Sequence, residues 1–77
     1  MASIVRCWRA DPAGSSAVLV ATWLVDAMAG VQGVRLRFAD TDFVVLDVAA
    51  PRFLDEIRDL LDQALAEPRF AGWKVLE

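Results

Sequence analysis

Two strand–helix–strand patterns follow one another along this chain, and their order restricts the possible folds more than any other feature of the sequence. Between positions 34 and 38, the apolar residues Val34, Leu36 and Phe38 alternate with arginines, which is the period-two pattern of a half-buried strand. Between positions 51 and 66, apolar residues instead recur every three or four positions, as on one face of a helix. The same criteria, applied along the chain, predict strands at 3–9, 34–38, 43–48 and 73–76 and helices at 12–29 and 51–66.

This β-α-β-β-α-β order is typical of the ferredoxin-like fold, an open-faced α+β sandwich. Two right-handed β-α-β crossovers that interleave produce one four-stranded antiparallel sheet with both helices on one face. The first and third strands are then central, the second and fourth are edges, and residues 39–42 form the turn between the second and third. We therefore expect residues 1–77 to form a single ferredoxin-like domain.

Aspartate and proline residues mark the predicted helix ends. Asp11 can accept hydrogen bonds from free helical N–H groups, and Pro12 fits the first helical position, so the first helix should begin there. Gly30 is a suitable stop for that helix. Pro51 should open the second helix, and Pro68 should end it because a proline disfavours helical geometry in the residue before it.

The ionisable and nucleophilic residues exclude several classes of site. The chain contains no His and a single Cys, Cys7, so it can build neither a zinc site of four Cys and His ligands nor an internal disulfide. No His is present to activate a Ser or Thr nucleophile, and Cys7 should be buried and inert. We expect no enzyme activity, no cofactor and no metal. A lone thiol suits a reducing compartment such as the cytoplasm.

Apolar residues make up 57% of the sequence, compared with roughly 45–50% in an average domain. A chain of 77 residues has little interior in which to bury this excess, which favours a protein partner or self-association. The net charge of −3 argues against a general nucleic-acid binder. The uncharged stretch between Asp11 and Asp26 is shorter than the roughly 20 residues of a membrane-spanning helix. Although the Ala-Met-Ala triplet at 27–29 imitates a secretion-signal cleavage site, we expect a buried helix and no membrane segment.

The alternation of side chains divides the strand residues between the two faces of the sheet. Beneath the helices it places a wholly apolar set: Val5, Cys7, Val34, Leu36, Phe38, Val44, Leu46 and Val48. On the opposite, open face it places Ile4, Arg6, Trp8, Arg35, Arg37, Phe43, Val45 and Asp47, joined by Lys74 or Trp73 from the last strand. The prediction is an aromatic and basic surface on a chain whose net charge is negative.

Three uses of this face remain open. The first is contact with a second copy of the chain, as a homodimer, or with another protein, because an apolar patch of this kind usually marks a contact surface. The second is single-stranded nucleic acid: the RNA-recognition motif shares the element order and stacks bases on aromatics of its central strands, where Trp8 and Phe43 lie here. Against this, the family's glycine-rich third-strand motif is missing, since residues 42–47 contain no Gly and two Asp. The third is an ordinary sheet surface with scattered apolar groups.

The first helix offers a second candidate contact surface. Between positions 16 and 29 its only charge is Asp26, so it is apolar on all sides. If Leu24 and its neighbours face the sheet, then Leu19 and Trp23 must point elsewhere. Either a partner covers both side chains, or Trp23 fills the groove between the two helices.

Residues 11–16 are a candidate anion site. Backbone N–H groups at a strand-to-helix junction can hold an anion, and the candidate residues are Asp11, Gly14, Ser15 and Ser16. This opening also resembles the D-x-P-G opening of regulatory amino-acid-binding domains of the ACT type, which would imply a small-molecule-binding regulatory domain. The alternative is an ordinary capped helix start.

Across nearly the whole chain, the spacing of elements resembles the heavy-metal-associated domain. That family runs strand, metal loop, helix ending in a Gly-Val step, hairpin, helix and a G-[YF]-x-V close. Here Gly30-Val31 or Gly33-Val34 stands at the step, and Gly-Trp-Lys-Val at 72–75 stands at the close. The paired cysteines of the family should fall near positions 13–17, which hold Ala, Gly and Ser, and copper transfer needs two thiolates. The resemblance therefore implies that the chain shares the architecture of this family. It also implies a function in protein contact that does not involve metal binding.

Overall fold

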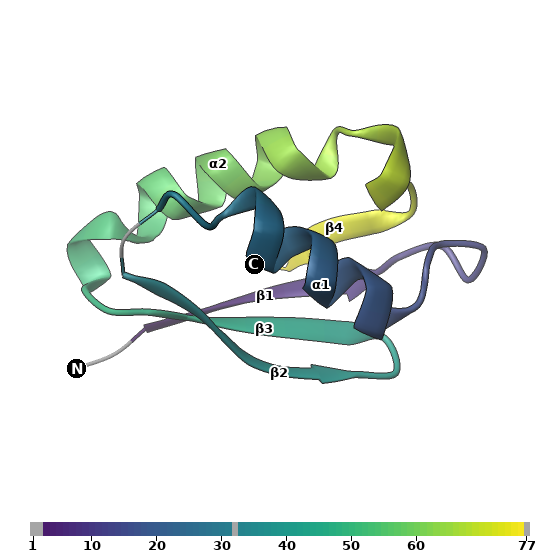
Figure 1. The fold of residues 1–77 in the computed structure, drawn as a ribbon, viewed down its shortest axis with the longest axis horizontal. Helices are drawn as coiled ribbons and strands as arrows, with labels where there is room; N and C mark the ends of the chain where they lie inside the picture. Colours follow the sequence, from purple (N-terminus) through teal and green to yellow (C-terminus); the bar gives the residue numbers. More distant parts are fainter. Residues whose placement is uncertain (1–2, 32, 77) are drawn as a thin grey trace.

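The computed structural model describes residues 3–31 and 33–76 (Figure 1). Three of the four strands have the predicted bounds, and the second is two residues longer than predicted, so only Thr41 and Asp42 remain in the hairpin turn. The second helix is preceded by a short 3-10 turn, and another lies before the last strand. The elements are β1 (Ser3–Arg9), α1 (Ala17–Ala27), β2 (Val34–Asp40), β3 (Phe43–Val48), η1 (Pro51–Phe53), α2 (Leu54–Leu65), η2 (Pro68–Phe70) and β4 (Trp73–Leu76).

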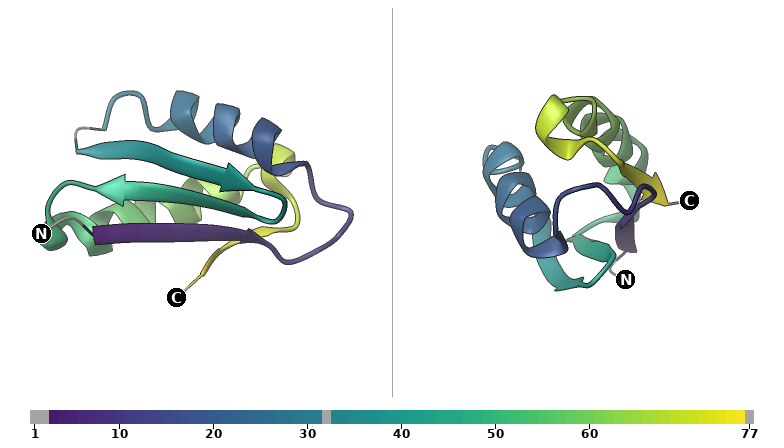
Figure 2. Two further views of the ribbon diagram at one scale, coloured as in Figure 1. Left: turned by 90° about the horizontal axis from the view of Figure 1, so that it is seen from below. Right: turned by 90° about the vertical axis from the view of Figure 1, so that its right-hand side faces the viewer.

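The strands form one antiparallel sheet in the order β2-β3-β1-β4. This order confirms that β1 and β3 are central and that β2 and β4 are edges. Both helices lie on one face of the sheet (Figure 2), with α1 against β2 and β3 and α2 against β4 and β1. The chain therefore has the ferredoxin-like topology, and no helix of the described residues covers the other face.

The first helix begins at Ala17, five residues later than predicted. Ser16 is the N-cap, and its hydroxyl oxygen accepts a hydrogen bond from the N–H of Leu19 at 3.5 Å. The helix ends at Ala27 and is followed by a turn through Gly30. Among the residues that the structure describes, no helix combines the length and the apolar character needed to cross a membrane.

Asp11 stabilises a turn and does not cap the helix, so the prediction of a helix start at Asp11 and Pro12 was wrong. Its carboxylate accepts the N–H of Ala13 at 2.9 Å, and its backbone carbonyl accepts the N–H of Gly14 at 2.8 Å. An Asp side chain that bonds to the backbone two residues ahead offers the chain a turn in place of a helix. The loop between β1 and α1 is consequently longer than the sequence suggested.

The core lies between the sheet and the helices. Val5 and Cys7 are buried beneath the helices as predicted, at 1% and 0% exposed. The apolar stripe of the second helix is less deeply buried than its periodicity suggested, because Phe53 and Leu60 remain 38% and 40% exposed. The fully buried large side chains are Phe70, Leu24, Leu46, Leu61, Val5, Val20, Val44 and Val48.

Gly72 connects the loop between β1 and α1 to the start of β4 through backbone hydrogen bonds. Its carbonyl accepts the N–H groups of Ala10 at 2.7 Å and Asp11 at 3.1 Å. Its φ of +87° lies in the left-handed region that favours glycine. A side chain there would also collide with the loop, because a Cβ would lie 3.0 Å from the Cβ of Asp11 and 3.2 Å from the Cα of Gly14.

The Gly72→Ala substitution should therefore lower the free energy of unfolding by about 2–3 kcal/mol, through backbone strain and loss of the close approach. Urea unfolding followed by circular dichroism measures the change. Gly30→Ala is the matched control, because a Cβ at Gly30 meets no atom within 4 Å. Equal losses in the two variants would show that the junction at Gly72 has no special role.

Candidate functional site

The cross-strand register determines which residues share the open face of the sheet. Residues that are directly opposite on paired strands point to the same side of a sheet, so the pairing produces three rows across it. We name them the hairpin row (Lys74, Trp8, Phe43 and Asp40), the middle row (Leu76, Arg6, Val45 and Phe38) and the far row (Ile4, Asp47 and Arg35).

Phe38 lies on the open face, and the prediction that it packs beneath the helices was wrong. Leu36 pairs with Leu46, but Phe38 pairs with Val45, so the register shifts between them and Arg37 is the extra residue of a β-bulge. An extra residue reverses the side-chain alternation for the rest of a strand. Phe38 is consequently turned outward and is 49% exposed.

Four apolar side chains are exposed together on this face. Ile4, Trp8, Phe38 and Phe43 are 45%, 36%, 49% and 38% exposed, and three of the four are aromatic. Val45 also lies on this face, but it is only 3% exposed between its two row neighbours. Val45 therefore supports the surface from below and offers little area for contact.

The open face is basic. Arg37 donates to the Asp47 carboxylate at 3.0 Å, which brings its guanidinium onto the face. Arg6, Arg35 and Lys74 lie on the same face and are exposed, whereas Trp73 points beneath the helices. The opposite side of the molecule carries the acidic residues of α2, which are Asp55, Glu56, Asp59 and Asp62.

The two residues of the second candidate surface, Trp23 and Leu19 on α1, have different environments. Trp23 packs its ring edge-to-face against Phe70, with centroids 5.9 Å apart and planes at 82°, so it fills space between α1 and η2. Leu19 is 49% exposed and does not share that role. Val18 and Val25 were not among the predicted site residues, yet they are 71% and 49% exposed. Apart from Thr22 and Asp26 the helix is apolar, and this composition is the sequence signal that could have identified them.

A shallow groove of about 370 Å³ runs between α1 and the edge strand β2 and is lined by Val18, Val25 and Leu36. Leu36 points to the helix side as predicted, but it remains 42% exposed. The adjoining edge is poorly suited to pairing with another strand, because it contains the bulge and the charged Arg35 and Arg37. Contact at this groove would therefore rest on apolar side chains and not on an added strand.

The predicted anion-site residues lie together in the loop between β1 and α1, but N–H groups that an anion would need are already bonded, because Gly14 donates to the Asp11 carbonyl and Leu19 donates to the Ser16 hydroxyl. Asp11 accepts the N–H of Gly14, and its carboxylate would repel an anion. The carbonyl of Ser15 accepts the indole N–H of Trp73 at 2.8 Å, and the hydroxyl of Ser16 caps α1. These contacts favour a structural role for the loop.

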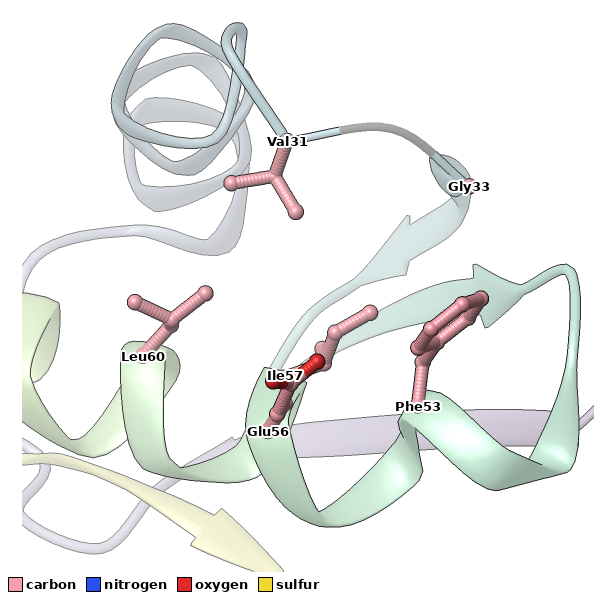
Figure 3. Close-up of a pocket in the computed structure, with 6 residues that line it drawn as sticks. All are labelled: Val31, Gly33, Phe53, Glu56, Ile57 and Leu60. Carbon is pink, nitrogen blue, oxygen red and sulfur yellow. The ribbon is translucent and has the colours of Figure 1, made fainter.

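A pocket of about 370 Å³ opens between the loop after α1 and the second helix. Figure 3 shows Val31 pointing toward Leu60 and Ile57 across it, with Phe53 at one end. Glu56 contributes the one carboxylate of its lining. A single acid among aliphatic and aromatic side chains suits an apolar contact.

Cys7 lies in the middle of β1 and is 0% exposed. Burial, and to a lesser extent the nearby negative charge of Asp62, raises the pKa of its thiol to about 12. A thiol that stays protonated is a poor nucleophile and a poor metal ligand. The buried position of Cys7 agrees with the sequence prediction.

The raised pKa of Cys7 predicts that the protein loses stability in alkaline solution. An unfolded thiol ionises near pH 8.5, so above that pH the unfolded chain releases a proton that the folded chain keeps. The stabilisation is complete below about pH 8.5 and is lost as the pH rises toward 12, at about 1.4 kcal/mol per pH unit. Urea unfolding at a series of alkaline pH values measures this fall. The Cys7→Ala variant lacks the thiol, so its stability should fall less steeply, by about 1.4 kcal/mol per pH unit, over the same range; an unchanged slope would refute the assignment.

In residues 3–31 and 33–76, no group of three or more His, Cys, Asp or Glu side chains is arranged to hold a metal ion. No protein-family model, no curated protein and no solved structure matches the chain. The open face, with its exposed aromatic rings and basic groups, is the main candidate functional site.

Proposed function

We propose that this chain is a non-enzymatic assembly domain that pairs with a second copy of itself through the open face of its sheet. The observation that carries the proposal is the exposure of Trp8, Phe38, Phe43 and Ile4 on the face that no helix of residues 3–31 and 33–76 covers. Tryptophan and arginine dominate the binding energy of protein interfaces, and this face contains both.

The size of the molecule indicates that a stable interface would need most of one face. Its extents are 34 × 21 × 21 Å, and a stable interface buries about 800 Å² on each partner. A single pocket or a short groove is too small to supply that area. On the sheet face, exposed aromatic side chains and Ile4 lie in adjacent rows.

The charges of the face allow it to pair with a second copy. The face contains acids as well as bases, since Asp40 and Asp47 lie in the same rows as Lys74 and Arg35. A surface with both signs can complement itself, whereas its acids would repel nucleic-acid phosphates. Single-stranded nucleic acid remains a second candidate because Trp8 and Phe43 are directly opposite on neighbouring strands, as a base-stacking platform requires.

The resemblance to the heavy-metal-associated domain fits this proposal as shared architecture used for protein contact. The thiol of Cys7, buried and protonated, would take no part in metal transfer. The cytoplasm is the proposed compartment, because the single free Cys is compatible with a reducing environment.

Sedimentation equilibrium over a concentration series tests the proposal. The weight-average mass should rise from 8.5 kDa toward twice that value between about 1 μM and about 500 μM protein. A constant mass of one chain over the whole range would overturn self-association. If added mixed-sequence single strands bind with an affinity that falls steeply with salt while the mass stays constant, the face would be assigned to nucleic acid.

A further inference from the structure

Resting on the proposed self-association, we infer that the two copies stack sheet on sheet about a two-fold axis parallel to the strands, with Lys74 of each copy facing Asp40 of the other. The hairpin row carries this inference. Lys74 lies on one edge strand and Asp40 on the other, and Trp8 and Phe43 lie between them. The row thus has opposite charges at its two ends and aromatic rings in its centre.

A two-fold axis parallel to the strands exchanges the two edges of the sheet and keeps each row opposite itself. β4 of one copy then lies over β2 of the other, so that each Lys74 meets an Asp40 and each Trp8 meets a Phe43. Facing sheets pack about 10 Å apart and cross at about 30°, a gap that extended Lys and Asp side chains span together. The ion pair forms twice in the assembly, because the contact is symmetric.

The middle row argues against the other simple arrangement, in which the two-fold axis runs across the strands. Under the same parallel axis, Leu76 meets Phe38, and Arg6 meets the small, buried Val45. A two-fold axis across the strands, centred on this row, would instead place each Arg6 opposite the Arg6 of the second copy. Like charges placed opposite each other in an interface are unfavourable, so the charges select the axis parallel to the strands.

Charge reversal tests this arrangement. Lys74→Asp and Asp40→Lys each create two like-charge contacts, and each should weaken the homodimer about tenfold in sedimentation equilibrium. The double variant should recover the wild-type dissociation constant. An equimolar mixture of the two single variants should form a heterodimer more tightly than either variant pairs with itself. In that mixed pair the new carboxylate at position 74 faces the new amine at position 40, and the unchanged Lys74 of one chain faces the unchanged Asp40 of the other.

Two further variants control for side effects. Asp59→Lys reverses an exposed charge on α2 and changes the net charge as Asp40→Lys does, so it should leave the dissociation constant within about twofold. The Asp40 carboxylate also accepts the N–H of Thr41 at 2.7 Å. Asp40→Asn keeps an acceptor for that N–H while removing the charge, and it should weaken the dimer about threefold.

The outcomes separate the arrangement from the proposed function. If the wild-type chain dimerises but the double variant is no tighter than the single variants, or the mixture forms no preferred heterodimer, the two-fold arrangement is overturned and self-association stands. If the wild-type chain stays at one chain mass at all concentrations, the proposed function fails and the arrangement fails with it. Recovery in the double variant together with heterodimer formation supports both.

Discussion

Replacing Phe70 by Ala should lower the free energy of unfolding by about 3–5 kcal/mol, because its ring is completely buried and its removal leaves a cavity. Trp23 would also lose the ring against which it packs at 5.9 Å. In a domain this small, such a loss consumes a large part of the total stability, which for native proteins is about 5–15 kcal/mol. Thermal and urea unfolding followed by circular dichroism measure the effect.

Phe53 provides an unusually close control for this prediction. The tripeptide Pro-Arg-Phe occurs twice, at Pro51–Phe53 and Pro68–Phe70, and forms a 3-10 turn both times. In both turns the guanidinium lies over the ring, at 4.8 Å for Phe53 and 4.9 Å for Phe70. Phe53→Ala removes the same ring and the same cation–π contact but at 38% exposure, so it should cost about 1–2 kcal/mol. Equal costs for the two variants would contradict the assignment of Phe70 to the core.

Replacing Trp8 by Ala should weaken self-association by about 2 kcal/mol or more, or about thirtyfold, while the domain stays folded. Trp8 lies in the centre of the hairpin row and is 36% exposed, so in a sheet-to-sheet contact it would be buried against the second copy. The dissociation constant from sedimentation equilibrium measures the loss, and a urea unfolding curve confirms the folded state.

Leu19→Ala distinguishes the two candidate surfaces. Leu19 is 49% exposed on α1, and α1 lies on the side of the sheet opposite the open face. We expect its substitution to leave the dissociation constant unchanged within about twofold, as for a surface residue outside an interface. A large effect of Leu19→Ala combined with none of Trp8→Ala would move the interface to α1.

Most of the fold could be predicted from the sequence because the strands and the second helix follow simple periodicities. The bounds of β1, β3 and β4 agree with the structure, as does the strand order. The start of α1 could not be predicted, because Asp11 suits a helix cap and a turn equally well and its choice depends on contacts with Gly72, which is distant in the sequence.

The open face was predicted less completely. Alternation places Trp8 and Phe43 outward correctly, but it assigns Phe38 to the wrong face because one extra residue at Arg37 changes the phase of the strand. The sequence 34–38 alternates without interruption and contains no Gly or Pro to mark a bulge. Burial also could not be predicted at the two Pro-Arg-Phe segments. The same three residues form a 3-10 turn both times, and the surrounding elements decide which ring enters the core.

The three indole N–H groups allow the central claim to be tested in one titration, a dilution series followed by proton–nitrogen correlation spectra. Trp8 lies on the open face, Trp23 packs on Phe70, and Trp73 donates its N–H to the Ser15 carbonyl beneath the helices. We predict that, of the three indole signals, only that of Trp8 shifts as the protein is concentrated, together with backbone signals of open-face residues such as 4, 38 and 43. Shifts confined to Trp23 and the exposed residues of α1, or no concentration dependence at any indole, would contradict pairing through the open face.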